Sequence, residues 1–110
     1  MVYPGRMADT SHALSTSVLK ERLQAAFPSL LEELTQLVAI PSVSSDPAHA
    51  ADVERSAEHI RERFAALGLE AKVLRESAED GTEGKPALVA HTPHIEGAPT
   101  VLLYAHHDVQ

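Results

Sequence analysis

The chain contains no cysteine among its 110 residues, and this absence removes several kinds of chemistry. Disulfides, thiolate metal sites and cysteine nucleophiles are excluded, and a reducing compartment such as the cytoplasm is favoured. Basic charge is also scarce, because the formal net charge is −7 and no basic stripe occurs along the sequence. The composition therefore argues against a general nucleic-acid-binding protein.

Long apolar runs are absent as well. No segment approaches the roughly 18 consecutive apolar residues that a membrane span requires. Residues 1–6 show neither the basic nor the apolar part of a secretory signal, and Met7 offers a second start. We therefore expect a cytoplasmic protein without a membrane span. Residues 1–15 are small and polar and should form a mobile arm, of which the first six residues add nothing to the fold.

Helical patterns follow this arm, in a chain whose 44% hydrophobic content is enough for one domain. Apolar residues recur at helical spacing from about residue 17 until Pro28 interrupts them. Ser29 and Glu32 form a capping box, which predicts a second helix over residues 30–39. This helix should end before Pro41, since the residue preceding a proline is pushed out of helical space.

A third helix has the clearest signature. Asp46 and Pro47 suit its N-cap and first position, and Gly68 is placed to end it. Its apolar stripe repeats at steps of four and three and comprises Val53, Ala57, Ile60, Phe64 and Leu67.

Three strands are predicted after the helices. Residues 69–73 alternate apolar with charged side chains, residues 86–91 look like a strand, and residues 101–105 form a continuous apolar run. Turn residues at Glu96 and Gly97 predict that the last two strands pair as a hairpin. The fold class expected is therefore α/β, with helices packed on a mixed β-sheet.

The candidate site lies directly after the run Val101–Ala105, which reads as a buried strand. His106, His107 and Asp108 follow it, at the position where α/β enzymes present catalytic and metal-binding groups. On extended backbone alternate side chains share a face, so His106 and Asp108 should lie on one side and His107 on the other. A histidine whose ring is oriented by a nearby carboxylate suits a metal site.

Two segments, residues 37–44 (LVAIPSVS) and 103–110 (LYAHHDVQ), resemble the N-terminal part of the dinuclear zinc peptidases. This family includes acetylornithine deacetylase, succinyl-diaminopimelate desuccinylase and carnosine dipeptidase. The resemblance implies that His106 binds one of two Zn²⁺ ions and that Asp108 is a catalytic carboxylate that orients this histidine. Gln110 is most like the dipeptidase branch, while Ala105 departs from the glycine of many members. His107 occupies a variable position and receives no ligand role.

The same resemblance implies that residues 16–110 are an incomplete catalytic domain. The bridging carboxylate, the general-base glutamate, the other zinc ligands and the second domain would all follow Gln110. The complete enzyme would hydrolyse amide bonds of dipeptides or N-acyl amino acids and could form a homodimer, with no nucleic-acid or membrane partner. The fragment alone is expected to be inactive.

The other histidines and the serines favour no alternative site. His91 would lie roughly 13 Å from His106 along the expected hairpin, so a self-contained metal site is disfavoured. His12, His49, His59, His91 and His94 are expected to be surface residues. Ser42 and Ser44 are read as linker serines because no G-x-S-x-G elbow occurs, and no phosphate-binding glycine loop is present. A non-catalytic α/β interaction module is the alternative function.

Overall fold

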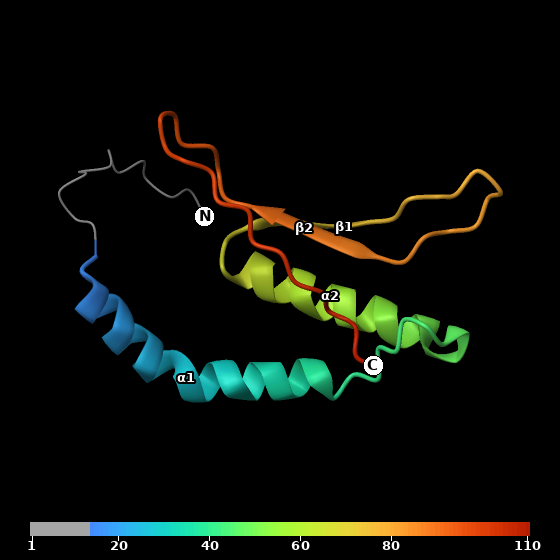
Figure 1. Ribbon diagram of the computed structural model, residues 1–110, viewed down its shortest axis with the longest axis horizontal. Coiled ribbons are helices and arrows are strands. Elements are labelled where there is room, and N and C mark those ends of the chain that lie inside the picture. Colours follow the sequence, from blue (N-terminus) through green and yellow to red (C-terminus); the bar gives the residue numbers. More distant parts are fainter. Residues whose placement is uncertain (1–13) are drawn as a thin grey trace. The chain divides into compact units, whose positions relative to one another are not determined.

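The computed structural model describes residues 14–110. The expected arm lies outside these residues except for positions 14 and 15, and so do the first six residues and His12. Five elements follow in order: α1 (Thr16–Val38), the 3₁₀ helix η2 (Pro47–His49), α2 (Ala50–Ala66), β1 (Glu70–Leu74) and β2 (Ala87–His91), as Figure 1 shows. The chain is thus a small mixed α/β fold. It divides into two compact units after Glu33, inside α1.

The first helical region is one helix, not two. α1 runs through Pro28, and Figure 1 shows it bending part-way along. The expected capping box at Ser29 is wrong, because its hydroxyl donates to the carbonyl oxygen of Ala26 (2.8 Å) within the helix. A proline removes only one helical hydrogen bond, and good helix formers on both sides let the helix continue past it. No residue of α1 is buried. None of the helices over residues 14–110 is long and apolar enough to cross a membrane.

The expected third helix is confirmed as α2 and ends at the predicted Gly68, but it begins at Ala50, because Asp46 and Pro47 start the 3₁₀ helix η2 instead. The carboxylate of Asp46 accepts from the amide of Ala48 (2.9 Å) at the start of η2, which leads directly into α2. At the other end the amide of Gly68 donates to Ala65 and the amide of Leu69 donates to Phe64. Gly68 has a φ of 81°, so this is the Schellman arrangement in which glycine ends a helix without strain.

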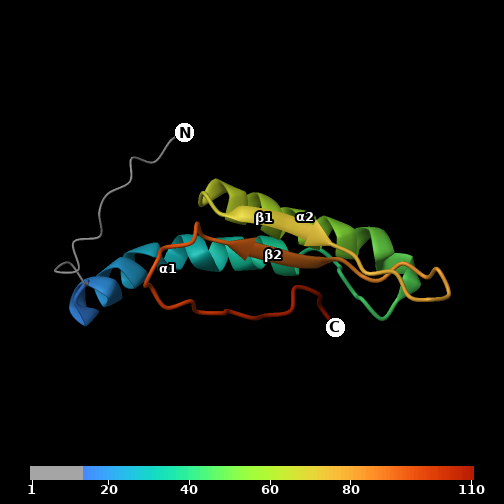
Figure 2. The same ribbon diagram turned by 90° about the horizontal axis from the view of Figure 1, so that it is seen from above.

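The strands predicted at residues 69–73 and 86–91 are confirmed as β1 and β2, but they pair with each other. They are antiparallel, with Glu70 opposite His91 and Leu74 opposite Ala87. Every second residue is half-buried, and these residues lie on the face of the sheet that packs against α2 (Figures 1 and 2). The most deeply buried apolar side chains, Val53 and Ala57, belong to α2 (4% and 0% exposed).

The expected hairpin between residues 86–91 and 101–105 does not form. Its turn is present, since the amide of Ala98 donates to the carbonyl oxygen of Ile95 (3.1 Å). However, residues 101–105 are not a strand, and the side chains of Val101 to Tyr104 are 75–92% exposed rather than buried. Pro93 and Pro99 flank the turn and lack the amide protons that a ladder between the two arms would need. The only regular sheet within residues 14–110 is therefore the antiparallel pair β1–β2, and the expected mixed sheet is wrong.

Candidate functional site

The segment that carries the candidate residues is joined to the stretch that follows α1. The amide of Val109 donates to the carbonyl oxygen of Ser42 (3.2 Å), and Val43 and Val109 form an isolated parallel β-bridge. This stretch was expected to be a linker, yet it acts as a short extended neighbour of the C-terminal segment. The bridge brings Ser44 next to Asp108.

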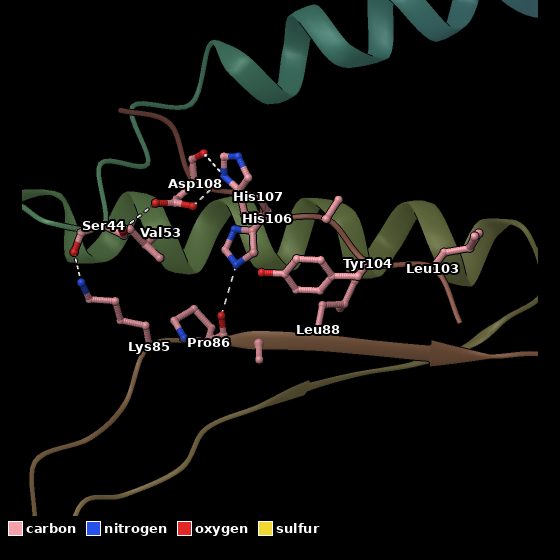
Figure 3. A pocket seen from close by; sticks show the side chains of 12 residues that line it. Ser44, Val53, Lys85, Pro86, Leu88, Leu103, Tyr104, His106, His107 and Asp108 are labelled. Carbon is pink, nitrogen blue, oxygen red and sulfur yellow. Dashed lines mark hydrogen bonds and ion pairs between the residues drawn. The ribbon is translucent and has the colours of Figure 1, made fainter. Parts of the chain in front are cut away.

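The imidazole of His106 is oriented by Asp108. Its Nδ1 lies 2.9 Å from Oδ1 of Asp108 and 3.1 Å from the carbonyl oxygen of the same residue (Figure 3). Both oxygens can only accept while the carboxylate is ionised, so Nδ1 carries the proton. In the neutral ring Nε2 keeps its lone pair, on a side chain that is 70% exposed. The neutral form of His106 is therefore the tautomer that a metal ion requires.

Asp108 is in turn held by Ser44. The serine hydroxyl donates to Oδ2 at 2.5 Å, across 64 residues of sequence. This hydrogen bond, followed by the one from His106, places the pKa of Asp108 below its ordinary value. The carboxylate thus stays ionised and keeps accepting the proton of the His106 ring. The side chain of Asp108 is 24% exposed, so the pair lies at the protein surface rather than in its core.

His107 points to the opposite side, as the alternation of extended backbone predicts. Its Nδ1 lies 2.6 Å from the hydroxyl oxygen of Ser56 on α2, and its Nε2 lies 3.2 Å from the carbonyl oxygen of Pro86, just before β2. Figure 3 shows the two imidazole rings directed away from each other. His107 therefore has structural partners on both ring nitrogens.

A pocket of about 320 Å³ lies beside these residues, and its lining comes from four places in the chain. Residues 85–88 and residues 103–108 form most of it, and Ser44 and Val53 complete it (Figure 3). Lys85 at its edge donates to the carbonyl oxygen of Ser44. The pocket thus combines apolar side chains such as Leu88 with the polar groups of His106 and Asp108.

Two other histidines of the described residues have carboxylate partners of their own. His49 is paired with Asp52 (2.7 Å), and His91 lies 3.6 Å from the carboxylate of Glu70 on the neighbouring strand. Within residues 14–110 no three His, Asp or Glu side chains are grouped so that they could hold a metal ion. In the part of the chain that the structure describes, His106 with Asp108 and His49 with Asp52 are therefore two separate histidine–carboxylate pairs, and only the first lines the pocket.

Sequence reasoning missed the residues that support this pair, namely Ser44, Ser56, Lys85 and Pro86. A weak signal existed for Ser44, because the alternation of serine and valine over residues 42–44 has the period of an extended strand. Nothing local marks Ser56, which occupies an ordinary helical position.

Comparisons of the chain with protein-family models, with curated proteins and with solved structures found no match.

Proposed function

We propose that this chain is the N-terminal portion of a zinc-dependent peptidase or amidohydrolase that cleaves dipeptides or N-acyl amino acids. His106 binds one zinc ion through Nε2, and Asp108 is the catalytic-site carboxylate that orients it. The observation that carries this proposal is the contact between Nδ1 of His106 and Oδ1 of Asp108 (2.9 Å), which directs Nδ1 to the carboxylate and leaves Nε2 on an exposed side chain for a metal ion.

The physical support lies in what the chain's own residues do. A zinc-binding histidine needs a neutral ring with its proton on the far nitrogen, and a carboxylate that accepts this proton both fixes the tautomer and raises the basicity of the ligand. Asp108 supplies this acceptor, and Ser44 keeps it ionised and in place. When bound, zinc polarises a scissile carbonyl and activates water.

The rest of the proposal rests on the resemblance of residues 37–44 and 103–110 to the dinuclear zinc peptidases. A zinc site needs three or four protein ligands, so the ligands for two ions would come largely from further polypeptide. The complete enzyme would be cytoplasmic, would use small peptides or N-acyl amino acids as substrates and could be a homodimer.

A zinc titration followed by NMR of the histidine side chains tests the proposal on the chain itself. We expect Nε2 of His106 to show the largest ¹⁵N shift and the response to disappear in His106→Ala. His94→Ala is the matched control, because His94 is also an exposed histidine. Zinc that shifts His49 or His91 while leaving His106 unchanged would contradict the assignment. In a longer polypeptide, His106→Ala and Asp108→Ala should both abolish amide hydrolysis.

The alternative, a non-catalytic α/β module that binds a partner, is favoured by one observation. Val101, Leu102, Leu103 and Tyr104 are highly exposed, and a contiguous apolar patch of this kind often marks an interaction surface. Zinc-dependent hydrolysis of a dipeptide by the longer polypeptide separates the two functions, because an interaction module would show none.

A further inference from the structure

The side chain of His107 connects the C-terminal segment to two other elements. Its Nδ1 contacts Ser56, which is completely buried on α2, and its Nε2 contacts the carbonyl oxygen of Pro86, which is buried just before β2. The Ser56 hydroxyl also lies 3.1 Å from the carbonyl oxygen of His107 itself. Side chain and backbone of this one residue are therefore both held, and Figure 3 shows the contact of its ring with Pro86.

These partners determine where the proton of a neutral His107 ring lies. The Pro86 carbonyl oxygen can only accept, so Nε2 must donate and carries the proton. Nδ1 is then an acceptor for the Ser56 hydroxyl, whose single proton serves either Nδ1 or the His107 carbonyl at any moment. His106 has the opposite tautomer, with its proton on Nδ1. Two adjacent histidines are thus held in opposite tautomers by acceptors on opposite sides of the backbone.

We propose that His107, Ser56 and the carbonyl group of Pro86 form a latch that positions His106 and Asp108, so that His107 is a positioning residue of the proposed zinc site. This inference rests on the proposed function. Residue 107 is the backbone link between the two site residues, and fixing it fixes the direction in which both neighbours project. On the opposite side the hydroxyl of Ser44 donates to Asp108, so residues 106–108 have hydrogen-bond partners on both sides of the backbone. The preceding residues 101–104 are exposed and contribute no comparable restraint.

The test uses the 110-residue chain at about pH 8, where imidazole is neutral. Ring ¹⁵N shifts report the tautomer of each histidine, and amide exchange at Val109 reports its hydrogen bond to Ser42. The wild type should show Nδ1–H for His106 and Nε2–H for His107. In His107→Ala and in Ser56→Ala we expect His106 to change to a mixture of tautomers and Val109 to exchange about tenfold faster or more. The affinity of His106 for zinc should fall by about 10- to 100-fold, as it does when a residue that orients a metal ligand is removed.

Two conservative variants of His107 distinguish the contribution of its hydrogen bonds from that of the volume of its side chain. His107→Asn keeps an acceptor near Nδ1 for Ser56, and His107→Gln keeps a donor near Nε2 for Pro86. Each should restore part of the wild-type tautomer signal, and they remain informative if His107→Ala does not fold. Losses equal to that of alanine in both variants would overturn the latch.

Phe64→Leu serves as the control for general destabilisation, since it weakens the half-buried side of α2 two turns from Ser56. It should leave the His106 tautomer unchanged. An equal effect in Phe64→Leu, or no effect in His107→Ala, would overturn the proposal. The test of the latch is also independent of the test of the proposed zinc site, because the histidine tautomers are measured in the absence of metal. If zinc does not bind His106 in the wild type, the proposed function fails while the tautomer data still decide the latch.

Discussion

Ser42→Ala should make this protein more stable, although it removes a polar group from the interior. Ser42 is completely buried, and its hydroxyl oxygen has no hydrogen-bond partner within the described residues. A buried hydroxyl that has lost its water and gained no partner costs about 1–3 kcal/mol. Alanine removes that penalty and keeps the methylene group that packs. We expect a gain of about 1 kcal/mol, which for a domain of this size raises Tm by about 4–8 °C.

Ser56→Ala is the matched comparison, because it deletes the same atom from an equally buried serine. Unlike Ser42, Ser56 lies in a helix and has two partners, the imidazole and the carbonyl oxygen of His107. Its loss leaves His107 without a donor, so we expect a cost of about 1–2 kcal/mol. The two variants should therefore move stability in opposite directions.

Urea denaturation followed by circular dichroism measures both effects, with thermal melting as a second readout. The m-value should stay unchanged, since neither substitution alters the surface that unfolding exposes. A lower free energy of unfolding in Ser42→Ala would show that the hydroxyl has a partner, such as an ordered water, and would refute the reasoning. Equal shifts in the two variants would refute it as well.

Three further substitutions test other parts of the structure. Gly84→Ala should cost about 1–3 kcal/mol in urea denaturation, because its Cβ would lie 2.5 Å from the backbone oxygen of Glu76, and an unchanged midpoint would contradict this. Ser44→Ala should raise the pKa of Asp108 toward its ordinary value in a ¹³C-carboxyl titration. The lowered pKa of Asp108 stabilises the folded state at pH values above the pKa of this group in the unfolded chain. That contribution disappears as the pH falls through the pKa in the folded chain. The Ser44→Ala variant lacks much of this contribution and should therefore lose less stability in acid. Pro28→Ala should increase helicity at 222 nm and stabilise α1 by up to about 3 kcal/mol, and a decrease would show that the bend in α1 is required.

The elements that the sequence predicted correctly are those whose signals are local. The start of η2 at Asp46 and the end of α2 at Gly68 each depend on residues within one helical turn, and both were recognised. The alternation over residues 69–73 likewise describes a strand with one covered face. Pro28 predicts a break that α1 does not have, because a single proline costs about 3 kcal/mol and a long run of helix formers can offset this.

Of the candidate site, the sequence predicts only the side of the backbone on which each side chain lies, because this follows from the alternation of extended backbone. Alternation alone places His106 and Asp108 on one side and His107 on the other. The partners that give each side chain its function come from distant positions, such as Ser44, which lies 64 residues from Asp108. No pattern within a sequence window contains such a pair, so the oriented tautomer of His106 became visible only in the structure.

Residues 101–105 have the local sequence pattern of a buried strand but do not form one. A continuous apolar run is typical of a strand covered on both faces and paired at its edges, and the sequence contains that run. Strand formation also requires neighbours, because an isolated extended segment satisfies none of its backbone groups. β2 pairs with β1 along one edge, and within residues 14–110 no ladder joins its other edge to residues 101–105. The composition of the segment and its exposure thus conflict within residues 14–110, and a further strand paired with residues 101–105 would remove this conflict. Adding such a strand should convert these residues from exposed to protected in amide exchange, while the contacts of His106, His107 and Asp108 stay as they are.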